Sequence, residues 1–130
     1  MTLVLDANVV VPSCLAPGGF DRFEDDLVAP PLMWPEARSA LHLAVWRGLL
    51  EAEDAVRGLR LLELGPVSVR SPAKLGREAW RIADELGMGH THDAEYLALA
   101  ELLRCRLVTA DGRLSRRAAH LDYVVGPTDL

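Results

Sequence analysis

The chain has 130 residues, of which half are hydrophobic and a quarter charged, and its net charge is −5. This composition is typical of a globular protein, and the length suffices for one continuous core, so we expect a single domain over residues 1–130. No apolar run approaches the about 18 residues that cross a bilayer, which excludes a membrane-spanning protein, and no secretory leader is recognised. We therefore expect a cytoplasmic protein in which Cys14 and Cys105 are free thiols.

Apolar periodicity and the placement of proline and glycine divide the first half of the chain into predicted elements. These are a buried strand at 2–5, a short helix at 7–16 that "PGG" ends, a short acidic helix at 21–27 and a long helix from Leu32 to Gly48, with Pro35 in its first turn, followed by an amphipathic helix at 51–63. The stretch 27–30 is compatible with either a short strand or the lead-in to the long helix.

The second half alternates in the same way. It predicts a short strand at 66–70, a helix at 71–87 with Ser71 as its cap and Gly87 as its stop, a helix at 92–105, a strand at 106–110, a helix at 112–121 and a last strand at 122–126. Strands that alternate with helices indicate an α/β fold in which a central, mostly parallel sheet is flanked by helices on both faces.

Two predicted strands end in an aspartate. "LVLDAN" reaches Asp6 and "RLVTAD" reaches Asp111. Ligand sites of open parallel sheets lie outside the carboxyl ends of the strands, so neighbouring strands would bring the two carboxylates together. Their repulsion favours a compensating cation, and an all-oxygen cluster selects Mg²⁺ or Mn²⁺ over zinc. The alternative is that each aspartate only caps the helix that follows it.

Two further acids stand at the starts of predicted helices. Asp93 opens the helix at 92–105, with Leu97 and Ala100 on the same face, and Glu36 lies in the first turn of the long helix. The helix dipole favours acids at such positions, which explains each residue separately. It does not explain why every junction of this kind carries an acid.

Four segments together resemble a known family. "LVLDAN", "PPLMWPEARSAL", "HDAEYLALAELL" and "RLVTADGRL" are similar, in this order, to the signature segments of PIN-domain ribonucleases, and most of all to the small toxins of the VapBC toxin–antitoxin type. The resemblance implies a PIN-like three-layer sandwich and a Mg²⁺- or Mn²⁺-dependent endoribonuclease. It further implies a cognate antitoxin and a homodimer. It implies a catalytic quartet, which is Asp6, Glu36, Asp93 and Asp111, and two supporting polar residues, which are Asn8 and Thr109.

On this hypothesis Asp6, Asp93 and Asp111 are metal ligands, and Glu36 is a further ligand or the base that positions water. The arginines after the last acid, which are Arg113, Arg116 and Arg117, are candidates for holding RNA phosphates. A solvated helix face is the alternative for them. His90 and His92 either form half of a zinc or nickel site or lie in a solvated loop, and the loop is favoured because no third ligand is near in the sequence.

The predicted helices between residues 31 and 63 carry more large apolar side chains than one buried face accommodates. These are Leu32, Met33, Trp34, Leu43, Trp46, Leu49 and Leu50. We therefore expect an exposed apolar patch. The family resemblance implies that this patch holds a groove for an antitoxin helix, beside a homodimer contact. The alternative is an ordinary core. For the whole chain, the alternative function is a non-catalytic PIN-like RNA-binding or RNA-processing module.

Overall fold

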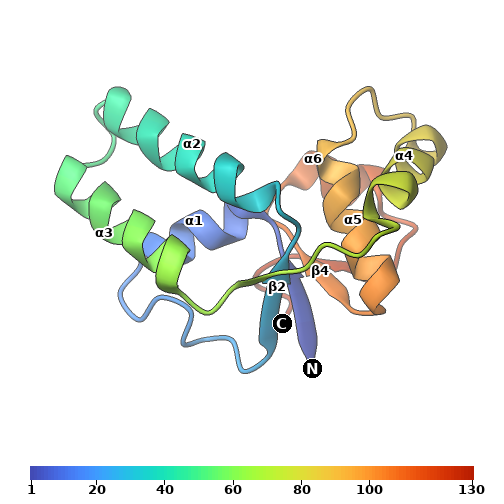
Figure 1. The fold of residues 1–130 in the computed structure, drawn as a ribbon, viewed down its shortest axis with the longest axis horizontal. Helices are drawn as coiled ribbons and strands as arrows, with labels where there is room; N and C mark the ends of the chain where they lie inside the picture. The colour runs from blue at the N-terminus through green and yellow to red at the C-terminus, as the bar shows by residue number, and fades with distance from the viewer.

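The computed structural model describes residues 1–130 and contains a five-stranded sheet between two groups of helices (Figure 1). Every strand pair is parallel, and the strand order is β3-β2-β1-β4-β5. In chain order the strands are β1 (Thr2–Leu5), β2 (Asp26–Ala29), β3 (Ser68–Val69), β4 (Arg106–Val108) and β5 (Val124–Val125). The predicted α/β class with a central parallel sheet is therefore confirmed.

The helices form the two outer layers. They are α1 (Ala7–Leu15), α2 (Met33–Trp46), α3 (Ala52–Leu64), α4 (Leu75–Leu86), α5 (His92–Leu103) and α6 (Gly112–Arg117). The first three pack against one another on one side of the sheet, and α4 and α5 pack together on the other side (Figure 1). No helix combines the length and apolarity that a membrane span requires.

The central strand shows why the sequence forms this sandwich. Leu3, Val4 and Leu5 are all fully buried, so β1 reads as a continuous apolar run and not as an alternating one. That pattern is expected of a parallel strand covered by helices on both faces. On α5 the buried residues run without a break from Tyr96 to Ala100, which makes this helix part of the core as well.

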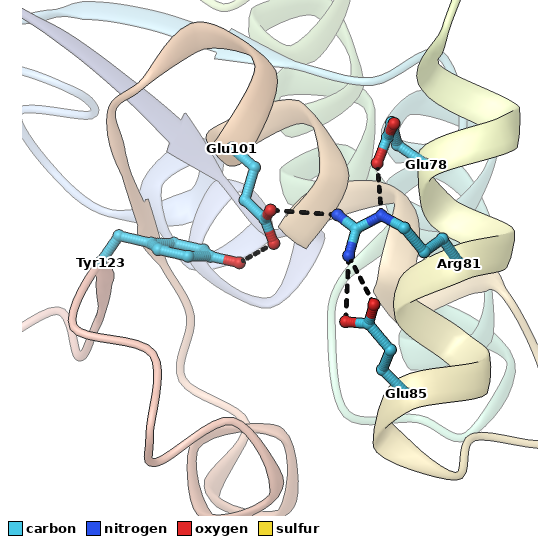
Figure 2. Close-up of polar contacts among 5 residues, drawn as sticks. All are labelled: Glu78, Arg81, Glu85, Glu101 and Tyr123. Atoms are coloured by element: carbon cyan, nitrogen blue, oxygen red, sulfur yellow. Dashed lines mark hydrogen bonds and ion pairs between the residues drawn. The ribbon is translucent and has the colours of Figure 1, made fainter.

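A polar network joins α4, α5 and the segment before β5 (Figure 2). Arg81 on α4 pairs with Glu78 at 2.7 Å and Glu85 at 2.8 Å on its own helix, and with Glu101 on α5 at 3.2 Å. Glu101 also accepts a 2.6 Å hydrogen bond from the hydroxyl of Tyr123. Single surface ion pairs contribute little, but this network fixes how the end of α5 sits against its neighbours.

Three local predictions are wrong. The helix expected to reach residue 121 is one of them, because α6 ends at Arg117 and residues 118–120 form a turn. Residues 21–25 form no helix, because the chain turns at Gly18 and Gly19, whose φ angles are +83° and +54°, and β2 begins at Asp26 to pair with β1. Helix α4 begins at Leu75 and not after Ser71, since a turn in which the Leu75 N–H bonds the Pro72 carbonyl comes first. The stretch 27–30, which the sequence left open, lies largely in β2.

Candidate active site at the carboxyl ends of β1 and β4

The fold places the two strand-end aspartates side by side. Strands β1 and β4 are neighbours with Leu5 opposite Val108, and the backbone N–H of Asp6 continues the ladder by bonding the Val108 carbonyl at 3.0 Å. Asp111 follows three residues later. The carboxyl ends of the two strands therefore open onto the same edge of the sheet, as the sequence predicted.

All four predicted acids line one open cavity at this edge. Asp93 reaches it from the second position of α5, and Glu36 reaches it from the first turn of α2. The cavity has a volume of about 430 Å³, and its lining residues are Asp6, Ala7, Asn8, Val11, Pro12, Glu36, Ala40, Asp93 and Asp111. Three layers of the sandwich thus contribute a carboxylate to one space.

Asp6 is the most buried of the four acids, with 6% of its surface exposed. Burial raises the pKa of its carboxyl from 3.8 to about 6, and the nearby charges of Asp93 and Glu36 act in the same direction. The hydrogen bond from the Thr109 hydroxyl, 2.8 Å long, lowers that pKa and offsets part of the shift. A carboxylate in this position gains stability from any cation that enters the cavity.

Asn8 and Thr109 tie the ends of β1 and β4 together. The Asn8 side chain donates to the Thr109 hydroxyl at 3.4 Å and accepts from the Ala110 backbone N–H at 3.0 Å. The Thr109 hydroxyl also accepts from the Asp111 backbone N–H at 3.1 Å. These two residues, which the family resemblance named as supporting, thus connect the backbone around Asp6 to the backbone around Asp111.

Asp111 and Asp6 differ in whether they cap a helix. One carboxylate oxygen of Asp111, Oδ1, accepts hydrogen bonds from the Arg113 and Leu114 N–H groups, so capping accounts for part of its role. Asp6 precedes α1 but forms no such side-chain bond. The capping alternative therefore accounts for Asp111 better than for Asp6, whose carboxyl has only a weak link to the start of α1, through the Asn8 backbone N–H.

Asp93 lies between acidic and basic neighbours. Burial raises the pKa of its carboxyl and the charge of Asp111 raises it further, whereas His92, Arg113 and Arg117 lower it. A second cavity, of about 210 Å³, joins Asp93 and Asp111 to Arg113 and Arg117. Arg116 does not line this cavity, so only two of the three predicted arginines border the acids.

The donor set suits a hard divalent cation. Its side-chain donors are oxygens, and two of its carboxyls, on Asp6 and Asp93, have raised pKa values through burial and mutual repulsion that a cation relieves. No three His, Cys, Asp or Glu side chains converge closely enough to hold an ion on their own. Mg²⁺ binds through one or two carboxylates and keeps several waters, so a set completed by water fits these residues.

Sequence reasoning missed two features of the site. Tyr96 on α5 donates a 2.5 Å hydrogen bond to Glu36, and the only available signal was its position three residues after Asp93. The loop before α5 forms a further cavity of about 290 Å³, which joins His90 and His92 to residues of the acidic site. The two imidazole rings are stacked with their centroids 6.0 Å apart, and no cluster of metal ligands forms around them.

A separate apolar groove runs between α2 and α3. Its volume is about 640 Å³, and its lining residues are Pro35, Arg38, Ser39, Leu41, His42, Val45, Ala52, Ala55, Val56 and Leu59. On α2 and in the turn that follows it, Leu43, Trp46 and Leu49 are 43%, 82% and 77% exposed and do not line the groove. Of the residues expected to overfill one face, Met33 is buried, Leu32, Trp34 and Leu50 are half-buried, and Leu43, Trp46 and Leu49 are exposed. That the exposed side chains form one apolar patch stays a prediction.

Comparison with known proteins gives consistent matches over most of the chain. The family model of the PIN domain matches residues 3–120. VapC ribonuclease Mb0985 of Mycobacterium bovis and ribonuclease VapC9 of Mycobacterium tuberculosis are each 34% identical over 115 residues, which cover 87% of this chain and 88% of theirs.

Three solved structures are similar in fold. The crystal structure of PAE2754 from Pyrobaculum aerophilum has a TM-score of 0.79 at 22% identity and covers 99% of this chain and 91% of its own. A toxin–antitoxin complex from Klebsiella pneumoniae has a TM-score of 0.66 at 15% identity, covering 95% of each chain. VapBC-1 from nontypeable Haemophilus influenzae reaches 0.65 at 19% identity, covering 98% and 99%.

Proposed function

The chain belongs to the PIN-domain family, and on that premise we propose that it is a Mg²⁺- or Mn²⁺-dependent endoribonuclease, the toxin of a toxin–antitoxin pair. The observation that carries the proposal is that Asp6, Glu36, Asp93 and Asp111 line one cavity beyond the carboxyl ends of two parallel strands. The names of the relatives, which are ribonucleases of the VapC type, support the same reaction.

The residues divide the work of phosphodiester hydrolysis among them. Asp6, Asp93 and Asp111 would hold the cation, in part through water, and Glu36 would orient the attacking water or accept its proton. Arg113 and Arg117 bind the phosphates beside the reacting one, because their guanidinium groups border the acids. When bound, a divalent cation supplies charge neutralisation at phosphorus and makes water easier to deprotonate.

We propose an amphipathic helix of a cognate antitoxin as the occupant of the groove between α2 and α3. The groove is lined mainly by apolar side chains, and Arg38 and His42 at its wall would contact acidic residues of such a helix. Glu36 borders the acidic cavity and Pro35 the groove, so a partner seated there lies beside the active site. A cationic side chain of that partner would compete with the metal for the carboxylates. A homodimer and a location in the cytoplasm stay predictions.

The decisive experiment is cleavage of mixed-sequence RNA by the purified chain in EDTA, Mg²⁺ or Mn²⁺, compared with Asp6→Asn. We expect cleavage only with metal and its loss in the variant. Asp84→Asn is the matched control, since Asp84 is exposed on α4 and does not line the cavity. A chain that binds RNA and cleaves none of it in either metal is the non-catalytic RNA-binding module, and the nuclease proposal is then wrong.

A further inference from the structure

Tyr96 is a fully buried tyrosine whose hydroxyl contacts a carboxylate of the candidate active site. Its side chain is 0% exposed, and the hydroxyl donates a 2.5 Å hydrogen bond to Oε1 of Glu36. Burial raises the pKa of the phenol and the bond to Glu36 raises it further, so the hydroxyl keeps its proton and remains a donor. A short bond from a neutral donor to a charged acceptor is of the stronger kind.

We propose that Tyr96 is a positioning residue that fixes the Glu36 carboxylate for its role in RNA cleavage. The inference rests on the proposed function, because it deepens the role of one member of the quartet. Glu36 is only half-buried, and its long side chain has several rotamers to choose from. With Oε1 engaged by Tyr96, Oε2 is the Glu36 oxygen that this bond leaves free, and the bond restricts the directions in which Glu36 can offer it.

The hydroxyl also links two layers of the sandwich. Glu36 lies on α2, on one side of the sheet, whereas Tyr96 and Asp93 lie on α5, on the other (Figure 1). Tyr96 is three residues after Asp93, so the two side chains emerge from neighbouring turns of the same helix. The bond therefore ties Glu36 to the helix that carries Asp93, and holds two of the four acids in register.

The alternative is that Tyr96 only fills the core. A phenylalanine would fill the same space, so packing accounts for the ring and not for the hydroxyl, which needs a partner in a buried position. Tyr96→Phe keeps the ring and removes the bond to Glu36. It separates the two explanations without creating a cavity.

The chain offers a matched control on the same helix. The Tyr123 hydroxyl donates a 2.6 Å hydrogen bond to Glu101 at the other end of α5, where the acidic cavity does not reach (Figure 2). Tyr123→Phe therefore removes the same type of bond, from a tyrosine hydroxyl to a glutamate, away from the reaction. Any general effect of losing such a bond should appear in both variants.

Turnover kinetics on one RNA substrate test the proposal. We expect Tyr96→Phe to lower kcat about tenfold or more, with KM changed less than about twofold, because a misplaced group affects the reacting state more than binding. Tyr123→Phe should leave kcat unchanged. In a Glu36→Gln background, Tyr96→Phe should cause no further loss, since its effect passes through Glu36. The positioning role is overturned if Tyr96→Phe lowers kcat by the same factor in the Glu36→Gln background as in the unsubstituted chain. A normal kcat for Tyr96→Phe alone overturns it as well.

A second measurement does not need turnover. In carboxyl NMR of protein with isotope-labelled glutamate, the resonance that disappears in Glu36→Gln belongs to Glu36. We expect it to shift in Tyr96→Phe and to stay in place in Tyr123→Phe, and an unmoved resonance in Tyr96→Phe overturns the contact. The two proposals fail differently. An unsubstituted chain that cleaves no RNA sinks the proposed function, whereas a cleaving chain in which both tyrosine variants behave alike sinks the positioning role.

Discussion

The hydroxyl of Thr109 donates a 2.8 Å hydrogen bond to Oδ2 of Asp6, across a sequence separation of 103 residues. The bond joins the end of β4 to the end of β1 and gives the buried Asp6 carboxyl a polar partner. It does not compensate for burial, because the pKa of Asp6 still lies at about 6. The site is therefore built at a cost to the stability of the metal-free chain.

Because of that cost, the difference in folding stability between Asp6→Asn and the unsubstituted chain should depend on pH. Because the folded state holds the Asp6 proton up to a pH of about 6 and the unfolded state releases it near 3.8, the folded state binds more protons in this window. Stability conferred by this group therefore falls as pH rises from about 4 to 6. At pH 8 in EDTA we expect Asp6→Asn to be more stable than the unsubstituted chain by up to about 3 kcal/mol.

Denaturant melts at pH 8 and near pH 3.5 measure this difference. The advantage of Asp6→Asn should shrink to near zero at the lower pH, where the aspartate is protonated in the folded state and largely protonated in the unfolded state. Asp84→Asn, at an exposed position on α4, controls for the change in net charge. A variant that is less stable than the unsubstituted chain at pH 8 would show that burial of the Asp6 charge is not a net penalty.

Divalent metal should stabilise the folded chain, and Asp111 allows ligation to be separated from capping. A cation that binds only the folded state adds about 2.7 kcal/mol at a concentration 100 times its Kd. Asn caps a helix about as well as Asp, and losing the Asp111 charge removes its repulsion of Asp93, so Asp111→Asn should be at least as stable as the unsubstituted chain in EDTA and lose much of the shift in Mn²⁺. Asp111→Ala should in addition lose about 1 kcal/mol in EDTA, through the missing cap. Thermal melts that show no metal shift for the unsubstituted chain would argue against a metal site.

The arginines after Asp111 give a prediction with an internal control. Arg113 and Arg117 border the acids, whereas Arg116 does not line that cavity. We expect Arg113→Ala and Arg117→Ala to weaken RNA binding similarly for all sequences and to lower its salt dependence, because phosphate contacts carry no sequence information. Arg116→Ala should bind normally. Filter binding at several salt concentrations measures this, and equal losses in all three variants would indicate a general basic surface instead.

The sequence predicted the features that local residue patterns determine, and it missed those that depend on contacts between distant segments. The apolar run of β1, the acid at its end and the glycine stop at Gly87 are local signals, and the structure has all three. The acidic stretch at 21–27 looked helical by composition, but strand pairing at Asp26 and two glycines with positive φ decided otherwise. Local propensity gives way to tertiary pairing of this kind.

In the candidate site, too, local rules predicted some features and missed a contact between distant residues. Placing Asp6 beside Asp111 needed only the rule for parallel sheets, and the strand neighbours agree with it. The bond from Tyr96 to Glu36 spans 60 residues and two layers, and nothing in either local sequence announces it. Arg113 and Arg117 are four residues apart and share one face of α6, so helical spacing in the sequence was a usable signal that separates them from Arg116.

The groove between α2 and α3 predicts where an antitoxin binds. Val56 lines it and is 57% exposed, so Val56→Glu should fold normally and place a charge in the path of an apolar helix face. Burying an unpaired charge is costly, and we expect the affinity for the partner to fall at least about 100-fold. Leu64→Glu is the matched control, because Leu64 lies on the same helix, is 81% exposed and does not line the groove.

Co-expression of each variant with the small open reading frame expected beside this one measures the effect. The partner should co-purify with the unsubstituted chain and with Leu64→Glu, and be lost with Val56→Glu, while RNA cleavage by the freed variant persists because the groove is separate from the acids. If Val56→Glu still retains the partner, the groove is not its docking site. If no partner co-purifies with any form, the toxin–antitoxin assignment loses its support, whereas the four carboxylates keep the nuclease proposal intact.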